Sequence, residues 1–172
     1  DVSELFGGGS FVEASKATAL NLTPGTAYDL RTGFDLSDPK VRGRVWEDLE
    51  RQSPAIVVGS PMCAASDRAK LSEGLEHDGE RSFLHEHSHG AWSWKLPKMQ
   101  AVLSLKEKFG HEVCEATCDQ RQFGLQAEGR FARKRTHWAT NARCIAQSLE
   151  VRCCRGHKHH DLTGNTARHA ER

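Results

Sequence analysis

Apolar positions along the chain switch between the two periodicities that distinguish strands from helices. Strand-like runs occupy residues 1–6, 26–30, 54–59, 82–87, 111–118 and 135–141. Apolar residues at helical spacing mark residues 11–22, 38–52, 68–75, 96–109 and 142–149. Because strands and helices alternate, we expect an α/β fold with a doubly wound, mostly parallel sheet.

Two segments carry the clearest local signals. Residues 54–59 (PAIVVG) are continuously apolar, which predicts a central strand covered on both faces. Asp38 and Pro39 are typical of a helix start, and Ser10 is placed to cap the helix expected from residue 11. Ligands of such sheets bind beyond the carboxyl ends of the strands, so residues that follow strands are the candidates for function.

Size and charge limit the possibilities further. With 172 residues and 19.1 kDa, we expect one α/β domain over residues 1–150 and a Cys/His-rich polar tail over 151–172. The net charge is only +1, so a basic surface for nucleic acid would have to be local. The candidate residues are Arg130, Arg133, Lys134, Arg135, Arg152, Arg155 and Lys158. An ordinary solvated polar face is the alternative.

Cysteine usage bears on the compartment. Six cysteines and ten histidines occur without a signal-peptide pattern, which favours a reducing, intracellular environment. No apolar run approaches the roughly 20 residues that a membrane-spanning helix needs.

Glycines and acids follow the first two predicted strands. The run Phe6, Gly7, Gly8 and Gly9 lets a ligand approach the backbone closely, although an ordinary glycine-rich turn explains it too. Asp29 is placed to accept hydrogen bonds from ribose hydroxyls, or else only to form a turn before Arg31 and Gly33. Asp35 is a candidate contact for an adenine amine, with helix or turn capping as its alternative.

A thiol and an acid follow the next two strands. Ser60 and Pro61 lead to Cys63, whose thiolate can add to an electron-poor ring carbon, although a buried inert cysteine is the commoner case. Glu86 ends the following strand, where a protonated acid can hydrogen-bond a base. Its alternative is an ion pair with a neighbouring basic residue.

Six segments in this order resemble cytosine carbon-5 methyltransferases, over residues 1–141. The chain is most similar to the divergent methyltransferase-like domains of retroelement polyproteins. The segments are ELFGGGSF for the cofactor loop, AYDL for the ribose acid, FDLSD for the adenine turn, GSPMC for the nucleophile loop, FLHEH for the catalytic glutamate, and QFGL followed by RKRTHWATN for the late basic strand. The resemblance implies a truncated Rossmann-like methyltransferase fold.

The resemblance also implies roles for individual residues. S-adenosylmethionine would contact Phe6, Gly7, Gly8, Gly9, Asp29, Asp35, Ser60 and Pro61. Cys63 would add to carbon 6 of cytosine and Glu86 would hold the ring nitrogen, with Arg133 or Arg135 as the basic partner. The implied partner is nucleic acid, DNA rather than RNA, which would place the protein in the nucleus, and flanking polyprotein domains are further partners.

Two alternatives stay open. Met62 and Ala64 flank Cys63, and His87 follows Glu86, where the family has other residues; a catalytically inactive module that only binds would show such departures. The tail offers Cys154, His157 and His159 as ligands for zinc, which would make the chain a zinc-stabilised nucleic-acid-binding module.

Overall fold

The computed structural model describes residues 1–16, 22–60, 81–104, 113–127, 129–154, 156, 158 and 160–162. Six strands form the main sheet: β1 (Val2–Leu5), β2 (Pro24–Tyr28), β3 (Ile56–Gly59), β4 (Ser82–Ser88), β5 (Cys114–Asp119) and β8 (Arg135–Thr140). Each overlaps a strand predicted from the sequence. The helix predicted over residues 68–75 lies outside the described residues.

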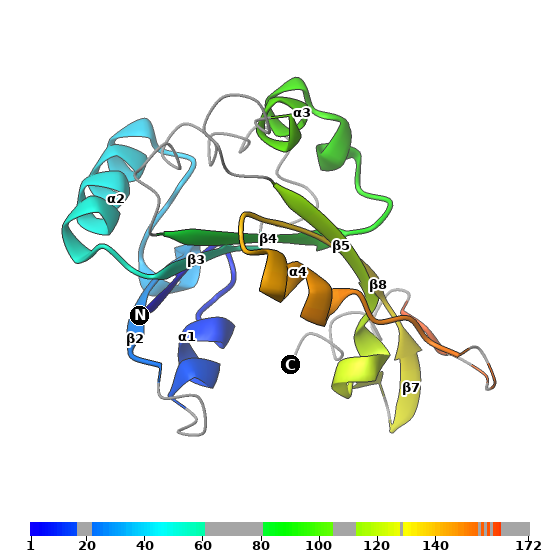
Figure 1. Cartoon of the computed structure of the whole chain (residues 1–172). Helices are drawn as coiled ribbons and strands as arrows, with labels where there is room; N and C mark the ends of the chain where they lie inside the picture. Colours follow the sequence, from blue (N-terminus) through cyan, green and yellow to red (C-terminus); the bar gives the residue numbers. More distant parts are fainter. Residues whose placement is uncertain are drawn as a thin grey trace.

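The strand order in the main sheet is β2-β1-β3-β4-β8-β5 (Figure 1). Strands β2, β1, β3 and β4 pair in parallel, whereas β8 runs antiparallel to both β4 and β5. The sheet is therefore mostly parallel, and the chain reverses its strand order beside β1, as doubly wound folds do. The predicted fold class is confirmed.

Helices cover both faces of this sheet (Figure 1). Helices α1 (Ser10–Ser15) and α4 (Arg143–Leu149) lie on one face; α2 (Pro39–Gln52), α3 (Pro97–Leu103) and the short turn η4 (Trp92–Lys95) lie on the other. The longest described helix, α2, begins as predicted: Asp38 Oδ1 accepts the Lys40 amide at 2.8 Å, and Pro39 is its first residue.

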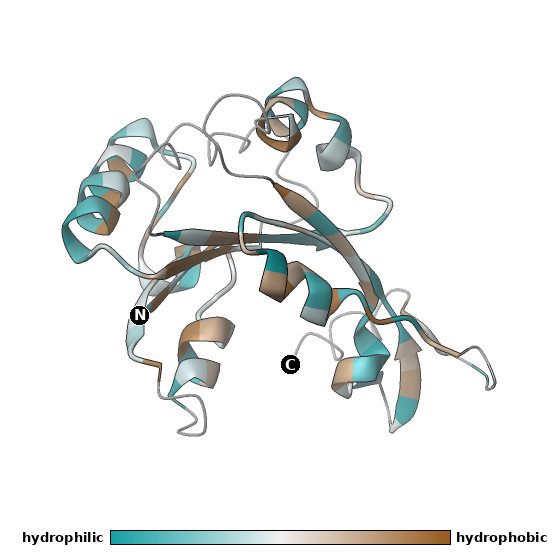
Figure 2. Cartoon of the chain, in the orientation of Figure 1, coloured by the Kyte–Doolittle hydropathy of each residue, from teal (hydrophilic) through white to brown (hydrophobic). Residues whose placement is uncertain are grey.

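Apolar side chains from the two faces of the sheet build separate cores. Under α1 and α4, Val58, Leu84 and Trp138 pack together, and under α2 the buried set is Leu5, Tyr28, Leu36, Val45, Leu49 and Val57. Figure 2 shows the apolar stretches of the helices turned toward the sheet. Since Val57 and Val58 are both buried on opposite faces, the continuous apolar run of β3 is the two-sided burial expected for a central strand.

A second, small sheet was not predicted. It consists of β6 (Gln126–Ala127), β7 (Arg130–Arg133) and β9 (His160–Asp161), and the turn η6 (Gln120–Phe123) precedes it. Residues after α4 return to the main sheet, where the Asp119 amide donates to the carbonyl of Val151 at 2.9 Å. None of the helices in the described part of the chain is long and apolar enough to cross a membrane.

Candidate cofactor site at the carboxyl edge of the sheet

A buried carboxylate fixes the glycine-rich turn after β1. Glu4 is fully buried, and its Oε2 accepts the backbone amides of Phe11 at 2.9 Å and Val12 at 3.3 Å. Its Oε1 accepts the Ser10 hydroxyl at 3.3 Å. The side chain of Glu4 therefore ties the end of the strand to the start of α1 across the glycine turn.

The turn itself requires glycine. A Cβ on Gly7 would lie 1.7 Å from Glu4 Oε1, so a side chain there would expel the carboxylate. Gly8 and Gly9 have φ of 66° and 92°, in the left-handed region. Gly9 is also the N-cap of α1, so the expectation that Ser10 caps the helix was wrong: Ser10 is its first residue, and its hydroxyl bonds Glu4 instead.

Three strand ends meet at this turn. The Phe6 amide donates to the Tyr28 carbonyl at 3.1 Å, and the Ser60 amide donates to the Leu5 carbonyl at 3.0 Å. The glycine turn thus lies between the ends of β2 and β3. Arg31 reaches the same place, because its Nη1 lies 3.2 Å from where a Cβ on Gly8 would be.

Asp29 is the first residue after β2, and its contacts are those of the turn-forming alternative. Its Oδ1 accepts a hydrogen bond from the Arg31 amide at 2.9 Å. The Asp29 amide in turn donates to the Thr32 hydroxyl at 3.0 Å, and these contacts form a capping box for the short turn η2 (Leu30–Thr32). Within the described residues its Oδ2 accepts no hydrogen bond. One carboxylate oxygen is therefore available for a ribose hydroxyl.

Asp35 is exposed and accepts both the amide and the hydroxyl of Ser37, at 2.9 and 2.6 Å. The capping alternative thus has direct support, and the adenine contact stays a prediction. A surface pocket of about 560 Å³ adjoins this turn, lined by Phe34, Arg44 and Asp48 among others. None of the glycine-turn residues lines it, so this hollow and the glycine turn are different places.

The nucleophile loop is described only at its start. Ser60 follows β3, and its buried hydroxyl has no hydrogen-bond partner among the described residues, so it is a candidate to bind a polar group of a ligand at this edge. Pro61 and Cys63 lie outside the described residues, and their predicted roles stay predictions.

Glu86 projects from β4 with a side chain 16% exposed, and Lys134 Nζ lies 3.9 Å from its Oε1. Arg135, one of the two predicted basic partners, instead binds Asp119 through its Nε at 3.0 Å, and this contact raises the pKa of Arg135. Arg133, the other, is exposed on β7. Among the described residues, a cation that the structure brings to Glu86 is Lys134, which the sequence argument placed only in the basic surface.

Histidines from two adjacent strands gather on the α3 face. His85 and His87 alternate with Glu86 on β4, and His87 lies directly opposite His137 on β8. His85 is buried in an edge-to-face contact with Trp94, at 5.2 Å between ring centroids, and within the described segments neither of its ring nitrogens has a hydrogen-bond partner. Burial lowers the pKa of His85 to about 4, so its ring is neutral near pH 7.

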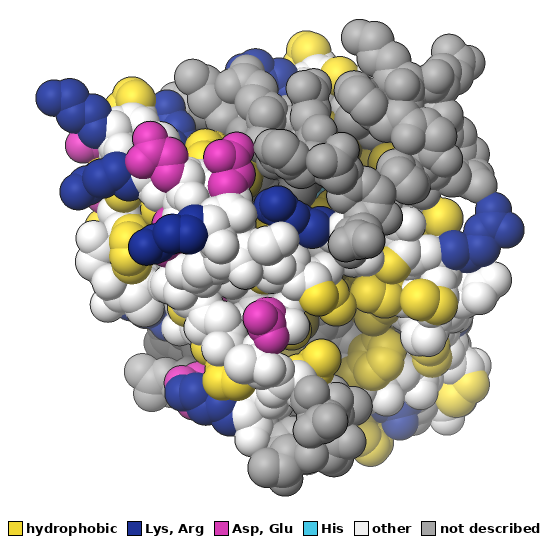
Figure 3. Space-filling model, turned by 60° about the vertical axis from the view of Figure 1, so that its left-hand side comes forward, with side chains coloured by type: hydrophobic (Ala, Val, Ile, Leu, Met, Phe, Trp, Pro, Cys, Tyr) yellow, Lys and Arg dark blue, Asp and Glu magenta, His cyan; other side chains and the backbone are white. Residues whose placement is uncertain are grey.

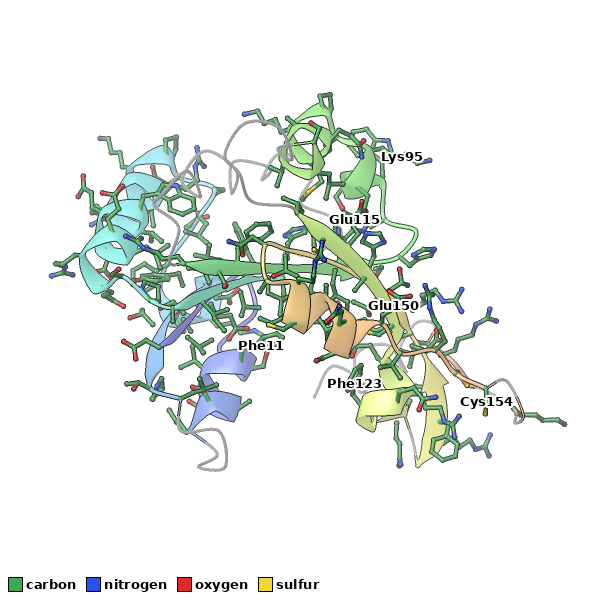
Figure 4. The ribbon with its side chains drawn as sticks, in the orientation of Figure 1. Phe11, Lys95, Glu115, Phe123, Glu150 and Cys154 are labelled. Atoms are coloured by element: carbon green, nitrogen blue, oxygen red, sulfur yellow. The ribbon has the colours of Figure 1, made fainter. Side chains whose placement is uncertain are left out.

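His137 lies at the exposed end of this cluster. Its Nε2 is 2.8 Å from Oε2 of Glu115, which Figure 4 shows on β5. No group of three or more His, Cys, Asp or Glu side chains in the described segments is arranged to hold a metal ion. Cys154 is exposed, whereas His157 and His159 lie outside the described residues, so the zinc prediction stays untested.

Comparisons with known proteins give little further. No family model matches the sequence, and no curated protein matches it. Among solved structures the chain is similar to precorrin-6y C5,15-methyltransferase from Geobacter metallireducens GS-15, with 14% identity, coverage of 81% of this chain and 77% of that chain, and a TM-score of 0.36. A likeness at this level assigns no function, so the functional argument rests on the residues described above.

Proposed function

We propose that the chain binds S-adenosylmethionine at the carboxyl edge of the sheet and transfers a methyl group to cytosine in nucleic acid. The observation that carries the proposal is the glycine turn braced by the buried carboxylate of Glu4 beside Asp29. A doubly wound fold binds nucleotide-like ligands at this place, where a tight turn lets the ligand meet the backbone.

The residues present fit such a cofactor. Asp29 Oδ2 would accept a ribose hydroxyl, and the unpartnered Ser60 hydroxyl would find a polar partner at the same edge. Arg31, whose guanidinium lies beside Gly8, supplies a cation that a carboxylate of the ligand would neutralise. When bound, the cofactor supplies an electrophilic methyl group.

For the transfer, the sulfur of Cys63 would add to carbon 6 of cytosine, making carbon 5 nucleophilic. Carbon 5 would then receive the methyl group that the bound cofactor supplies, leaving S-adenosylhomocysteine. Loss of the carbon-5 proton to solvent water and breaking of the carbon–sulfur bond would restore the ring double bond and return the thiolate. Glu86 would hold the ring nitrogen during these steps, from the strand next to β3. These roles rest on the family resemblance of the motifs.

Calorimetric titration with S-adenosylhomocysteine tests the binding step. Asp29→Asn keeps one acceptor oxygen for the Arg31 amide and removes the charge, so we expect the affinity to fall about tenfold or more with the fold intact. Asp38→Asn is the matched control, since Asp38 also accepts an amide two residues on and lies at the start of α2. Absence of binding to a folded wild-type chain would refute the proposed cofactor site.

A second experiment separates an active enzyme from an inactive binding module. Transfer of labelled methyl groups to single-stranded and duplex DNA and to RNA is measured with wild type and with Cys63→Ser. The mechanism is supported if the substitution abolishes methyl transfer and leaves the binding of S-adenosylhomocysteine unchanged. Cofactor binding without transfer to any acceptor would favour the inactive module.

A further inference from the structure

The turn η6 and the strand β7 expose aromatic rings. Phe123 on η6 is 56% exposed and Phe131 on β7 is 44% exposed, and η6 packs against β7. Figure 4 shows Phe123 projecting from η6 beside the small sheet. Two large exposed rings thus lie on two short neighbouring elements, and exposed apolar groups that lie together indicate an interaction surface.

Positive charge concentrates on the same segment. From residue 120 to 135 the sequence holds five Lys and Arg residues against one acid, in a chain whose net charge is only +1. Arg130 and Arg133 are exposed, and Arg121 places its guanidinium 3.9 Å over the ring of Phe131. By contrast, Figure 3 shows cationic and acidic side chains interspersed on the face that carries α2.

The pleat of β7 explains why both features face outward. Ala132 is fully buried, so Phe131 and Arg133, its neighbours on either side, leave the strand on the opposite face. The strand therefore presents a ring next to a cation, and Arg130, on the side of Ala132, is exposed at the start of the strand. We call the exposed residues of η6 and β7, Phe123, Arg130, Phe131 and Arg133, the aromatic–arginine surface.

We propose that the aromatic–arginine surface binds an unpaired polynucleotide strand, with bases stacked on Phe123 and Phe131 and phosphates held by Arg130 and Arg133. Only a ligand that combines negative charge with flat, accessible rings uses both features, because a duplex hides the faces of its bases. The proposal deepens the proposed function and rests on it for the strand's role as methyl acceptor. Its own evidence is the rings and charges of this surface.

Fluorescence anisotropy with a labelled 16-nucleotide single strand, as DNA and as RNA, tests the proposal on the full chain without cofactor. Removing the ring on which one base stacks weakens binding roughly 5- to 150-fold, and we expect this loss of affinity for Phe131→Ala and for Phe123→Ala. Phe131→Trp should bind at least as tightly as wild type. Arg130→Ala should reduce the slope of log affinity against log salt by about 1.

Matched controls come from elsewhere on the chain. Trp92 is 63% exposed on η4, so Trp92→Ala removes an equally exposed ring outside the surface and should leave the affinity unchanged. Arg44→Ala on α2 removes an exposed positive charge outside the surface and should likewise leave the affinity unchanged. Thermal melting of each variant confirms that the fold is kept.

Two outcomes would overturn the proposal. One is wild-type affinity in both phenylalanine variants; the other is equal competition by duplex DNA or by heparin, a polyanion without bases, which would reduce the surface to nonspecific charge. Because S-adenosylhomocysteine titration is a separate readout, failure of strand binding and failure of the cofactor site are distinguished.

Discussion

The buried ring of His85 makes the stability of the protein depend on pH. Its pKa falls from 6.5 to about 4, first because burial removes water from the ring and then because His87 and His137 lie nearby. The unfolded chain takes up this proton near pH 6.5, whereas the folded chain takes it up only near pH 4. Between these values the unfolded state binds more protons, so the free energy of unfolding decreases as the pH falls.

The magnitude follows from the shift. A pKa difference of about 2.5 units lowers the free energy of unfolding by about 3 kcal/mol at a pH well below 4, and by about 2 kcal/mol at pH 5. His85→Phe removes this titration and keeps the edge contact with Trp94, which lies 5.2 Å away between centroids. It also removes two buried nitrogens that have no partner, so we expect the variant to match or exceed wild type by about 1 kcal/mol at pH 7.5.

Urea unfolding followed by tryptophan fluorescence at pH 7.5 and pH 5.0 measures the effect. The difference between the two pH values should be about 2 kcal/mol smaller in His85→Phe than in wild type, because His87, whose pKa burial and then Lys134 also lower, titrates in both proteins. His89→Gln, at an exposed histidine, is the control and should retain the wild-type pH dependence. An equal pH dependence in wild type and His85→Phe would refute the reasoning.

Two further predictions follow from the described contacts. Gly7→Ala should lower the free energy of unfolding in urea by about 2–3 kcal/mol and abolish cofactor binding, because its Cβ displaces the buried Glu4 carboxylate. At Gly43 on α2 a Cβ meets nothing within 4 Å, so Gly43→Ala should stabilise the protein by about 0.5–1 kcal/mol. Equal losses of stability in both variants would contradict this. Iodoacetamide should modify exposed Cys154, whose pKa the Gly156 amide lowers, well before buried Cys118, whose pKa burial raises, as followed by mass spectrometry of the labelled peptides; early labelling of Cys118 would contradict the burial.

The main sheet was predictable because its strands carry local signals. The apolar run of residues 54–59 and the Asp38-Pro39 helix start both mark their elements within a few residues, and β3 and α2 formed there. The small sheet has no such signal, since β6 and β9 contain two residues each and β9 pairs with β7 across a long stretch of chain. Its pairing depends on tertiary contacts that no local pattern records.

The candidate site was only partly predictable for a similar reason. The glycines predict the turn after β1. The residue that holds this turn, Glu4, is separated from its backbone partners by seven and eight positions. An acid near the end of a strand that leads into three glycines was the signal available for it. Asp29 was predictable in position, but which of its carboxylate oxygens the turn uses is a matter of geometry.

The register of the antiparallel strand β8 places Lys134, and not Arg135, beside Glu86. Because β8 lies between β4 and β5 and pairs Trp138 with Glu86, Arg135 stands three positions away and leaves the sheet on the opposite face, where it binds Asp119. Lys134, just before the strand, reaches Glu86. The role proposed for Glu86 would therefore bring the acceptor base close to Lys134 as well, since its Nζ lies 3.9 Å from Glu86 Oε1.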